Sequence, residues 1–169
     1  MGYKEYLVKR KKGAKEILLS VLIYIAAVIL SLVAIIFLPA IGGVELLISV
    51  GFLYGGYWLS SKFNREFEYT VTEDSVDVDV IFNAARRKRL ISFSMKNVEM
   101  IASIKSEEYK AFSNKSGYQE IDATTRRKDA NVYFAAVEKN GRFLVKFELP
   151  VTALQELRKY APSKVVISQ

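Results

Sequence analysis

The sequence predicts a membrane protein of mixed α and β structure, in which a two-helix transmembrane hairpin precedes an antiparallel β domain closed by a C-terminal helix. Three observations carry this prediction. An apolar tract is interrupted near Pro39, the composition changes at residue 62 to alternating apolar and charged residues, and an amphipathic stretch follows Pro150. We therefore divide the chain into a basic juxtamembrane segment (1–16), the helical hairpin (17–61) and a cytosolic domain (62–169).

The first half of the apolar tract is long enough to cross a bilayer. Residues 17–38 contain no charged side chain, and at about 1.5 Å per residue they form about 33 Å of helix, against a hydrocarbon core of about 30 Å. Residues 43–61 are less apolar because they contain Glu45 and four glycines. Because they follow the first span directly, they are predicted to return through the membrane. The tract is too long for a cleaved signal sequence.

Charges at the ends of the hairpin predict its orientation. Basic residues precede the first span, and Lys62 and Arg65 follow the second, whereas the turn between the spans has none. The positive-inside rule therefore predicts a multi-pass protein of the cell membrane with both termini in the cytoplasm. Cations beside an anionic leaflet attract its lipids. The predicted juxtamembrane lipid contacts are Lys9, Arg10, Lys11, Lys12 and Lys15.

The composition excludes several classes of chemistry. The sequence has no histidine and no cysteine, which removes thiolate nucleophiles, Cys/His zinc sites and histidine general bases. Glu45 is alone in the apolar tract. We expect no catalytic residue, no metal and no cofactor. The net charge of +7 would suit nucleic acid, but an anionic membrane surface explains it more simply, so no nucleic acid partner is expected.

Two features of the first 61 residues leave alternatives open. Tyr3, Tyr6, Leu7 and Arg10 recur at helical spacing, which indicates either a short amphipathic helix on the membrane surface or a frayed basic tail. Gly51 and Gly55 form a small-residue groove. This pair is a candidate for helix packing, against the first span in preference to a second copy.

The start of the cytosolic domain has the alternation of β-strands. Residues 66–72 alternate, and Val76, Val78, Val80 and Phe82 predict an inward face opposite a solvated Asp77 and Asp79. A turn is expected at 83–85.

Two basic runs are the candidate contacts with anionic lipid or a partner. The first follows the predicted turn, where strand alternation prevents its four side chains from facing one way. A solvated hairpin tip is the alternative. The candidate contacts are Arg86, Arg87, Lys88, Arg89, Arg126, Arg127 and Lys128.

The remaining chain predicts further strands and one helix. A helical turn is expected at 96–100 and strands at 101–104 and 118–121. The polar stretch 105–129 has a predicted loop at 113–117. Asn140-Gly141 predicts a type I′ turn between strands 131–138 and 142–149. A helix is expected at about 150–161, with a capping box from Thr152 to Gln155.

With these segments in order, the chain resembles bacterial membrane-anchored pleckstrin-homology-like (PH-like) proteins, in particular small two-span proteins of Gram-positive bacteria. The resemblance implies a bent seven-stranded sheet capped by a helix and no enzymatic activity. At the turn 83–85 the sequence has Asn-Ala-Ala where the family usually has glycine. The likeness rests on residues 69–72 and 76–81, the run 86–89 leading into 90–92, residues 96–101 and the helix after Pro150.

The expected function is that of a non-enzymatic integral membrane protein whose PH-like domain binds an unidentified protein partner or anionic membrane lipids at the inner leaflet. The alternative is an accessory or oligomeric subunit, a homo-oligomer included, assembled through the transmembrane hairpin.

Overall fold

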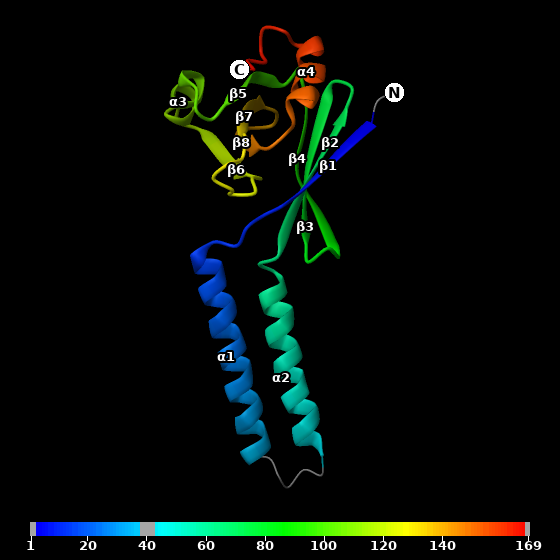
Figure 1. The fold of residues 1–169 in the computed structure, drawn as a ribbon, viewed down its shortest axis with the longest axis vertical. Helices are drawn as coiled ribbons and strands as arrows, with labels where there is room; N and C mark the ends of the chain where they lie inside the picture. Colours follow the sequence, from blue (N-terminus) through cyan, green and yellow to red (C-terminus); the bar gives the residue numbers. More distant parts are fainter. Residues whose placement is uncertain (1–2, 38–42, 168–169) are drawn as a thin grey trace. The chain divides into compact units, whose positions relative to one another are not determined.

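The computed structural model describes residues 3–37 and 43–167, which form two compact units (Figure 1). One unit, here called the domain, combines residues 1–11 with 66–169, and the other, the helical hairpin, comprises residues 12–65. The hairpin is therefore an insertion between the first and second strands of the domain. The expected division, in which the domain began at residue 62 and the N-terminal segment stood apart, differs from this arrangement.

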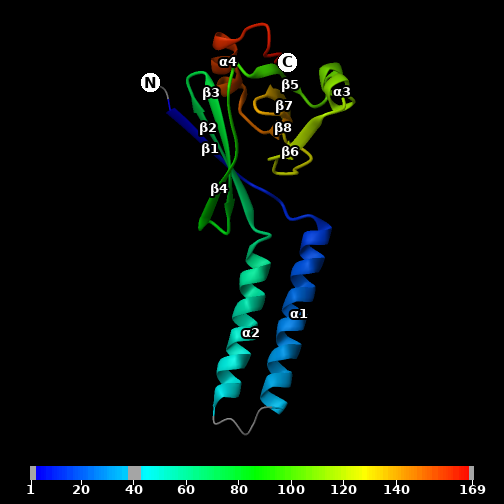
Figure 2. The ribbon, with the colours of Figure 1, turned by 180° about the vertical axis from the view of Figure 1, so that it is seen from behind.

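Two helices make up the hairpin, α1 (Ala14–Phe37) and α2 (Val44–Ser61), and they run side by side in both views (Figures 1 and 2). Among the described residues, α1 alone is long and apolar enough to cross a membrane. The more polar α2 contains Glu45, three glycines and two terminal serines. The predicted turn at Pro39 lies outside the described residues.

Small side chains let the two helices approach each other. Ser49 Oγ donates a hydrogen bond to the Ser31 carbonyl across the interface, at 3.1 Å. A Cβ placed on Gly56 would lie 2.7 Å from the Ala27 Cβ, whereas no heavy atom lies within 4 Å of such a Cβ at Gly51 or Gly55. The expectation that Gly51 and Gly55 pack against the first helix is therefore wrong. Gly56 follows Ser49 by seven positions, about two helical turns, which puts both on the helical face toward α1.

The first sheet of the domain has the strand order β1-β2-β3-β4, from β1 (Tyr3–Lys9), β2 (Arg65–Thr72), β3 (Ser75–Phe82) and β4 (Arg86–Ser94). β1 pairs antiparallel with β2, from Tyr3↔Thr72 to Lys9↔Glu66. The N-terminal segment is thus an edge strand, and the expected amphipathic helix or frayed tail is wrong. It brings the described strands to eight, where the resemblance implied seven.

The hairpin of β3 and β4 follows the predicted alternation. Val76, Val78 and Val80 are buried, and the turn falls at residues 83–85 as expected. Asn83 and Ala84 have φ of 52° and 53°. Alanine in this left-handed conformation costs about 1–2 kcal/mol, which explains why glycine suits the position.

The second sheet has the order β5-β7-β8-β6 and includes a parallel pair, β6 with β8. β7 and β8 are joined through a three-residue loop, because Glu138 pairs with Arg142. The predicted hairpin is therefore present, but its two-residue type I′ turn is not. β5 begins where a helical turn was expected. The strands are β5 (Val98–Ser103), β6 (Tyr118–Asp122), β7 (Tyr133–Glu138) and β8 (Arg142–Phe147).

Two helices complete the domain. α4 (Val151–Tyr160) buries Leu154 and Leu157 in the core that both sheets share. Pro150 is its N-cap and makes no side-chain cap, so the expected capping box is wrong. α3 (Glu107–Ser113) lies in the polar stretch ahead of the loop predicted at 113–117, where no helix was expected, and its Phe112 packs on Phe134 of β7.

Candidate functional site

The strand pairing brings basic segments to one end of the first sheet. Lys9, at the C-terminal end of β1, is paired with Glu66 at the start of β2. β2 and β3 are joined by a two-residue turn, so the end of β3 lies beside the start of β2. There Phe82 pairs with Arg86 of β4. The N-terminal basic segment and the first basic run therefore lie at the same end of this sheet.

The second basic run, residues 126–128, lies beside the N-terminal basic segment. The residues that make this contact were not predicted from the sequence. The Lys11 N–H donates to the Thr125 carbonyl at 2.9 Å. Asp122 forms ion pairs with Arg10, at 3.0 Å, and with Arg126, at 3.5 Å. Residues 9–11 and 126–128 therefore belong to one surface, which we call the basic end of the domain together with residues 86–89.

Lys11, a residue of this surface, is close to the first helix of the hairpin along the chain. Only three steps along the chain separate Lys11 from Ala14, the first residue of α1. Lys12 and Lys15, the other predicted juxtamembrane contacts, belong to the hairpin unit.

Asp122 is the centre of the contact between the two basic segments. It accepts hydrogen bonds from the Thr124 N–H and hydroxyl. Burial alone would raise the pKa of Asp122, but these hydrogen bonds and the charges of Arg10 and Arg126 outweigh it and lower the pKa. The Arg10 side chain is 7% exposed. Arg10 is therefore part of the domain interior and not a free lipid contact.

Two arginines of the first run are held by acidic side chains on the outer face of the sheet. Arg87 pairs with Glu68 and Asp79, and Arg89 pairs with Asp79 and Asp77. The side chains of Glu68 and Asp79 are only 6% and 5% exposed. The prediction of a solvated Asp79 is therefore wrong. The hydrogen bond to Asp79 and the charges of both aspartates raise the pKa of Arg89.

The other basic residues of the site are exposed. Arg86 and Lys88 pair with Phe82 and Val80, so they project from the sheet face opposite Arg87. Among the described residues, neither has an acidic partner within 4.0 Å, and the same holds for three more cations. The exposed, unpaired cations of the basic end are Lys11, Arg86, Lys88, Arg127 and Lys128.

The chemistry of this arrangement is the attraction of anions. Exposed ammonium and guanidinium groups bind phosphate oxygens by charge and by hydrogen bonds. Within the part of the chain that the structure describes, no group of three or more His, Cys, Asp or Glu side chains could hold a metal ion. The exposed cations make the basic end a surface that attracts anionic groups.

Sequence reasoning predicted the basic runs but missed Asp122, Thr125 and Glu68. A local signal existed for Asp122 alone, which precedes Arg126 by four residues, the spacing of their ion pair. Glu68 meets Arg87 across 19 positions of sequence, so no local pattern indicates that contact.

Comparison with known proteins identifies a family. The family model described as Bacterial PH-like domain (DUF6106) matches residues 2–167. None of the curated proteins and none of the solved structures matches the chain. The family match covers the helical hairpin as well as both sheets.

Proposed function

Since the chain belongs to the family of bacterial PH-like domains, which indicates a binding or scaffold role, we propose that it is a non-enzymatic integral membrane protein that binds anionic lipid with the basic end of its domain. The hairpin would cross the membrane twice, with both termini in the cytoplasm. The apolar composition of α1 supports the first crossing, and the packing of α2 beside it supports the return.

The observation that carries this proposal is the convergence of three basic segments at the end of the domain that is covalently joined to α1. Five of their cations are exposed and unpaired among the described residues. A cation beside an anionic leaflet contributes about 1 kcal/mol. Lipid headgroups are therefore the anions that this surface would meet first.

Short-chain lipids provide the test. The full-length protein in neutral detergent is titrated with dihexanoyl phosphatidylglycerol and, separately, with the zwitterionic phosphatidylcholine, at low and high salt. We expect salt-sensitive binding of phosphatidylglycerol. The double variant Arg86→Ala/Lys88→Ala should weaken it by about 30-fold, since two cations contribute about 2 kcal/mol.

A matched double variant controls for net charge. Lys96→Ala/Lys159→Ala removes two exposed lysines away from the basic end, since Lys96 follows β4 and Lys159 lies on α4. It should leave phosphatidylglycerol binding nearly unchanged. Equal binding of the two lipids, or equal losses in the two double variants, would contradict the proposal.

The other expected partners stay predictions. A homo-oligomer assembled through the hairpin predicts that Gly51→Ile/Gly55→Ile shifts the elution volume in mild detergent. An unchanged elution volume would argue against that assembly.

A further inference from the structure

The outer edge of β1 is tied to the rest of the domain at two points and open between them. Toward its start, Lys4 Nζ lies 2.5 Å from a Glu156 carboxylate oxygen of α4. Beyond its end, Arg10 is paired with Asp122. β1 is the first strand of its sheet, so in the described part of the chain no strand pairs with the backbone groups that point away from β2. Residues 5–8 lie between the two ties.

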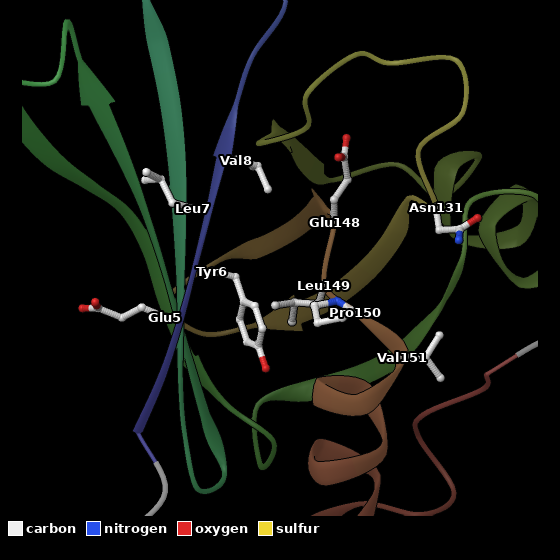
Figure 3. Close-up of a pocket in the computed structure, with 9 residues that line it drawn as sticks. All are labelled: Glu5, Tyr6, Leu7, Val8, Asn131, Glu148, Leu149, Pro150 and Val151. Carbon is white, nitrogen blue, oxygen red and sulfur yellow. The ribbon is translucent and has the colours of Figure 1, made fainter.

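A groove of about 510 Å³ runs along this open stretch. Four consecutive residues of β1, Glu5 to Val8, form one wall, and Asn131 with residues 148–151 forms the other. Side chains alternate along a strand, so four consecutive residues can line one groove only if the strand presents its backbone edge. Tyr6 and Val8 point into the groove, toward Leu149, whereas Glu5 and Leu7 point to the other face of the sheet (Figure 3).

We propose that this groove binds an extended peptide segment of a partner protein, which adds to β1 as a further strand of the first sheet. Unpaired backbone groups at a sheet edge are a template for such addition, and flanking side-chain contacts give specificity. Four residues of strand measure about 13 Å. The groove therefore takes a segment of four or five residues.

The lining determines the chemistry of the segment. No lysine or arginine lines the groove, although the whole chain has a net charge of +7. Its two acidic residues are Glu148, whose carboxylate accepts hydrogen bonds from Thr125, and Glu5, whose side chain lies on the outer face of the sheet (Figure 3). Partner residues opposite Tyr6 and Val8 would face the apolar side chains of the groove. Those in between would lie on the outer face, near Glu5. The segment thus alternates apolar residues with lysine or arginine.

A single strand fits better than a second copy of the chain. The wall formed by residues 148–151 limits the groove on the side away from β1, so an incoming strand that already belongs to a sheet would bring its neighbours against this wall. Two of the other edges, β5 and β4, are less suited. Ile101 of β5 exchanges backbone hydrogen bonds with Lys164 and Val166, and β4 has a bulge and four basic residues, features that discourage strand addition.

This inference goes beyond lipid binding and does not depend on it, because the groove and the basic end use different residues, and either can fail alone. The test uses the full-length protein in neutral detergent and two fluorescein-labelled heptapeptides, one alternating valine with lysine and the other valine with glutamate. Fluorescence anisotropy should give saturable binding of the lysine peptide, at least about 10-fold tighter than that of the glutamate peptide. The net charge of the protein would by itself favour the reverse order.

Charge reversal and hydrogen exchange locate the binding. Glu5→Lys should weaken binding of the lysine peptide by about 10-fold, whereas the matched variant Glu107→Lys, on α3, should not. Both glutamates are exposed, so both variants are expected to fold. Bound peptide should also slow amide exchange in residues 5–8. The inference is overturned by absence of saturable binding up to about 1 mM, by equal affinity for the two peptides, or by binding that leaves exchange in residues 5–8 unchanged.

Discussion

The two basic runs of the domain look alike in the sequence but each divides into two kinds of cation in the structure. In the first run, Arg87 and Arg89 are paired with carboxylates of β2 and β3, while Arg86 and Lys88 are exposed and have no acidic partner among the described residues. In the second run, Arg126 is paired with Asp122, and the next two residues are exposed. The formal charge of a basic run is therefore not the charge that it offers to a ligand.

The division follows from strand geometry. Alternation along β4 sends Arg87 to the sheet face that carries Glu68 and Asp79, where guanidinium groups bridge carboxylates that are almost completely buried. A buried carboxylate without a partner would be costly. The paired arginines therefore stabilise the fold, and the unpaired cations on the opposite face remain for binding.

Removal of residues 1–11 should have the largest effect on the stability of the domain, because it removes the whole strand β1 together with Arg10, one of the paired cations. Residues 62–169 alone lack β1 as well as the helical hairpin, and we expect their unfolding free energy to be several kcal/mol below that of a domain that keeps β1, a large part of the stability of a domain of this size. Tyr6 and Val8 would leave the core, β2 would become an edge, and Asp122 would lose Arg10. Far-UV circular dichroism in a urea titration measures the loss.

A chain in which a six-residue Gly/Ser linker joins Lys11 to Glu66 is the matched comparison. It retains β1 and omits the helical hairpin, and its linker reaches about 20 Å. This protein should unfold cooperatively at a clearly higher urea concentration than residues 62–169. Equal midpoints for the two proteins would show that β1 adds nothing to the domain and would place Arg10 with the free cations.

The sequence allowed prediction of elements whose own residues determine them. The alternation in 66–72 and 76–82 and the apolar stripe after Pro150 indicated β2, β3 and α4. The segment Tyr3 to Arg10 fits helical spacing, yet Tyr6 and Val8 also alternate. Pairing with β2, more than fifty residues later, decides between the two patterns. The sequence did not predict α3 because its stretch is mostly polar and Tyr109 and Phe112 alone do not make a clear apolar pattern. Their role is apparent only in the structure, where both rings contact Phe134.

Two single substitutions in the first basic run test the difference between ion-paired and unpaired cations. Arg87→Ala removes the ion-pair partner of the buried Glu68 and should lower the unfolding free energy by about 2 kcal/mol. Arg86→Ala, one residue earlier, should change it by less than about 0.5 kcal/mol, as expected of an exposed side chain. Urea denaturation of the linker-joined domain measures both. Similar losses in the two variants would mean that the two classes of cation are not distinct.

The pH dependence of stability should give the smallest effect and depends on Asp122, the carboxylate between the two basic segments. Its pKa is lowered in the folded protein from the ordinary value of 3.8. Below that value, the unfolded state therefore binds more protons than the folded state, and the contribution of Asp122 to stability, present above 3.8, is lost as the pH falls through the folded pKa. Because the side chain is 31% exposed, the part of the pH dependence due to Asp122 should be less than about 1 kcal/mol.

Other carboxylates titrate in the same range, so the informative quantity is the difference between the wild-type protein and Asp122→Asn. That difference in unfolding free energy should be constant near neutral pH and should shrink as the pH falls below 3.8. A difference that stays constant throughout would mean that the Arg10 and Arg126 contacts do not depend on the charge of Asp122.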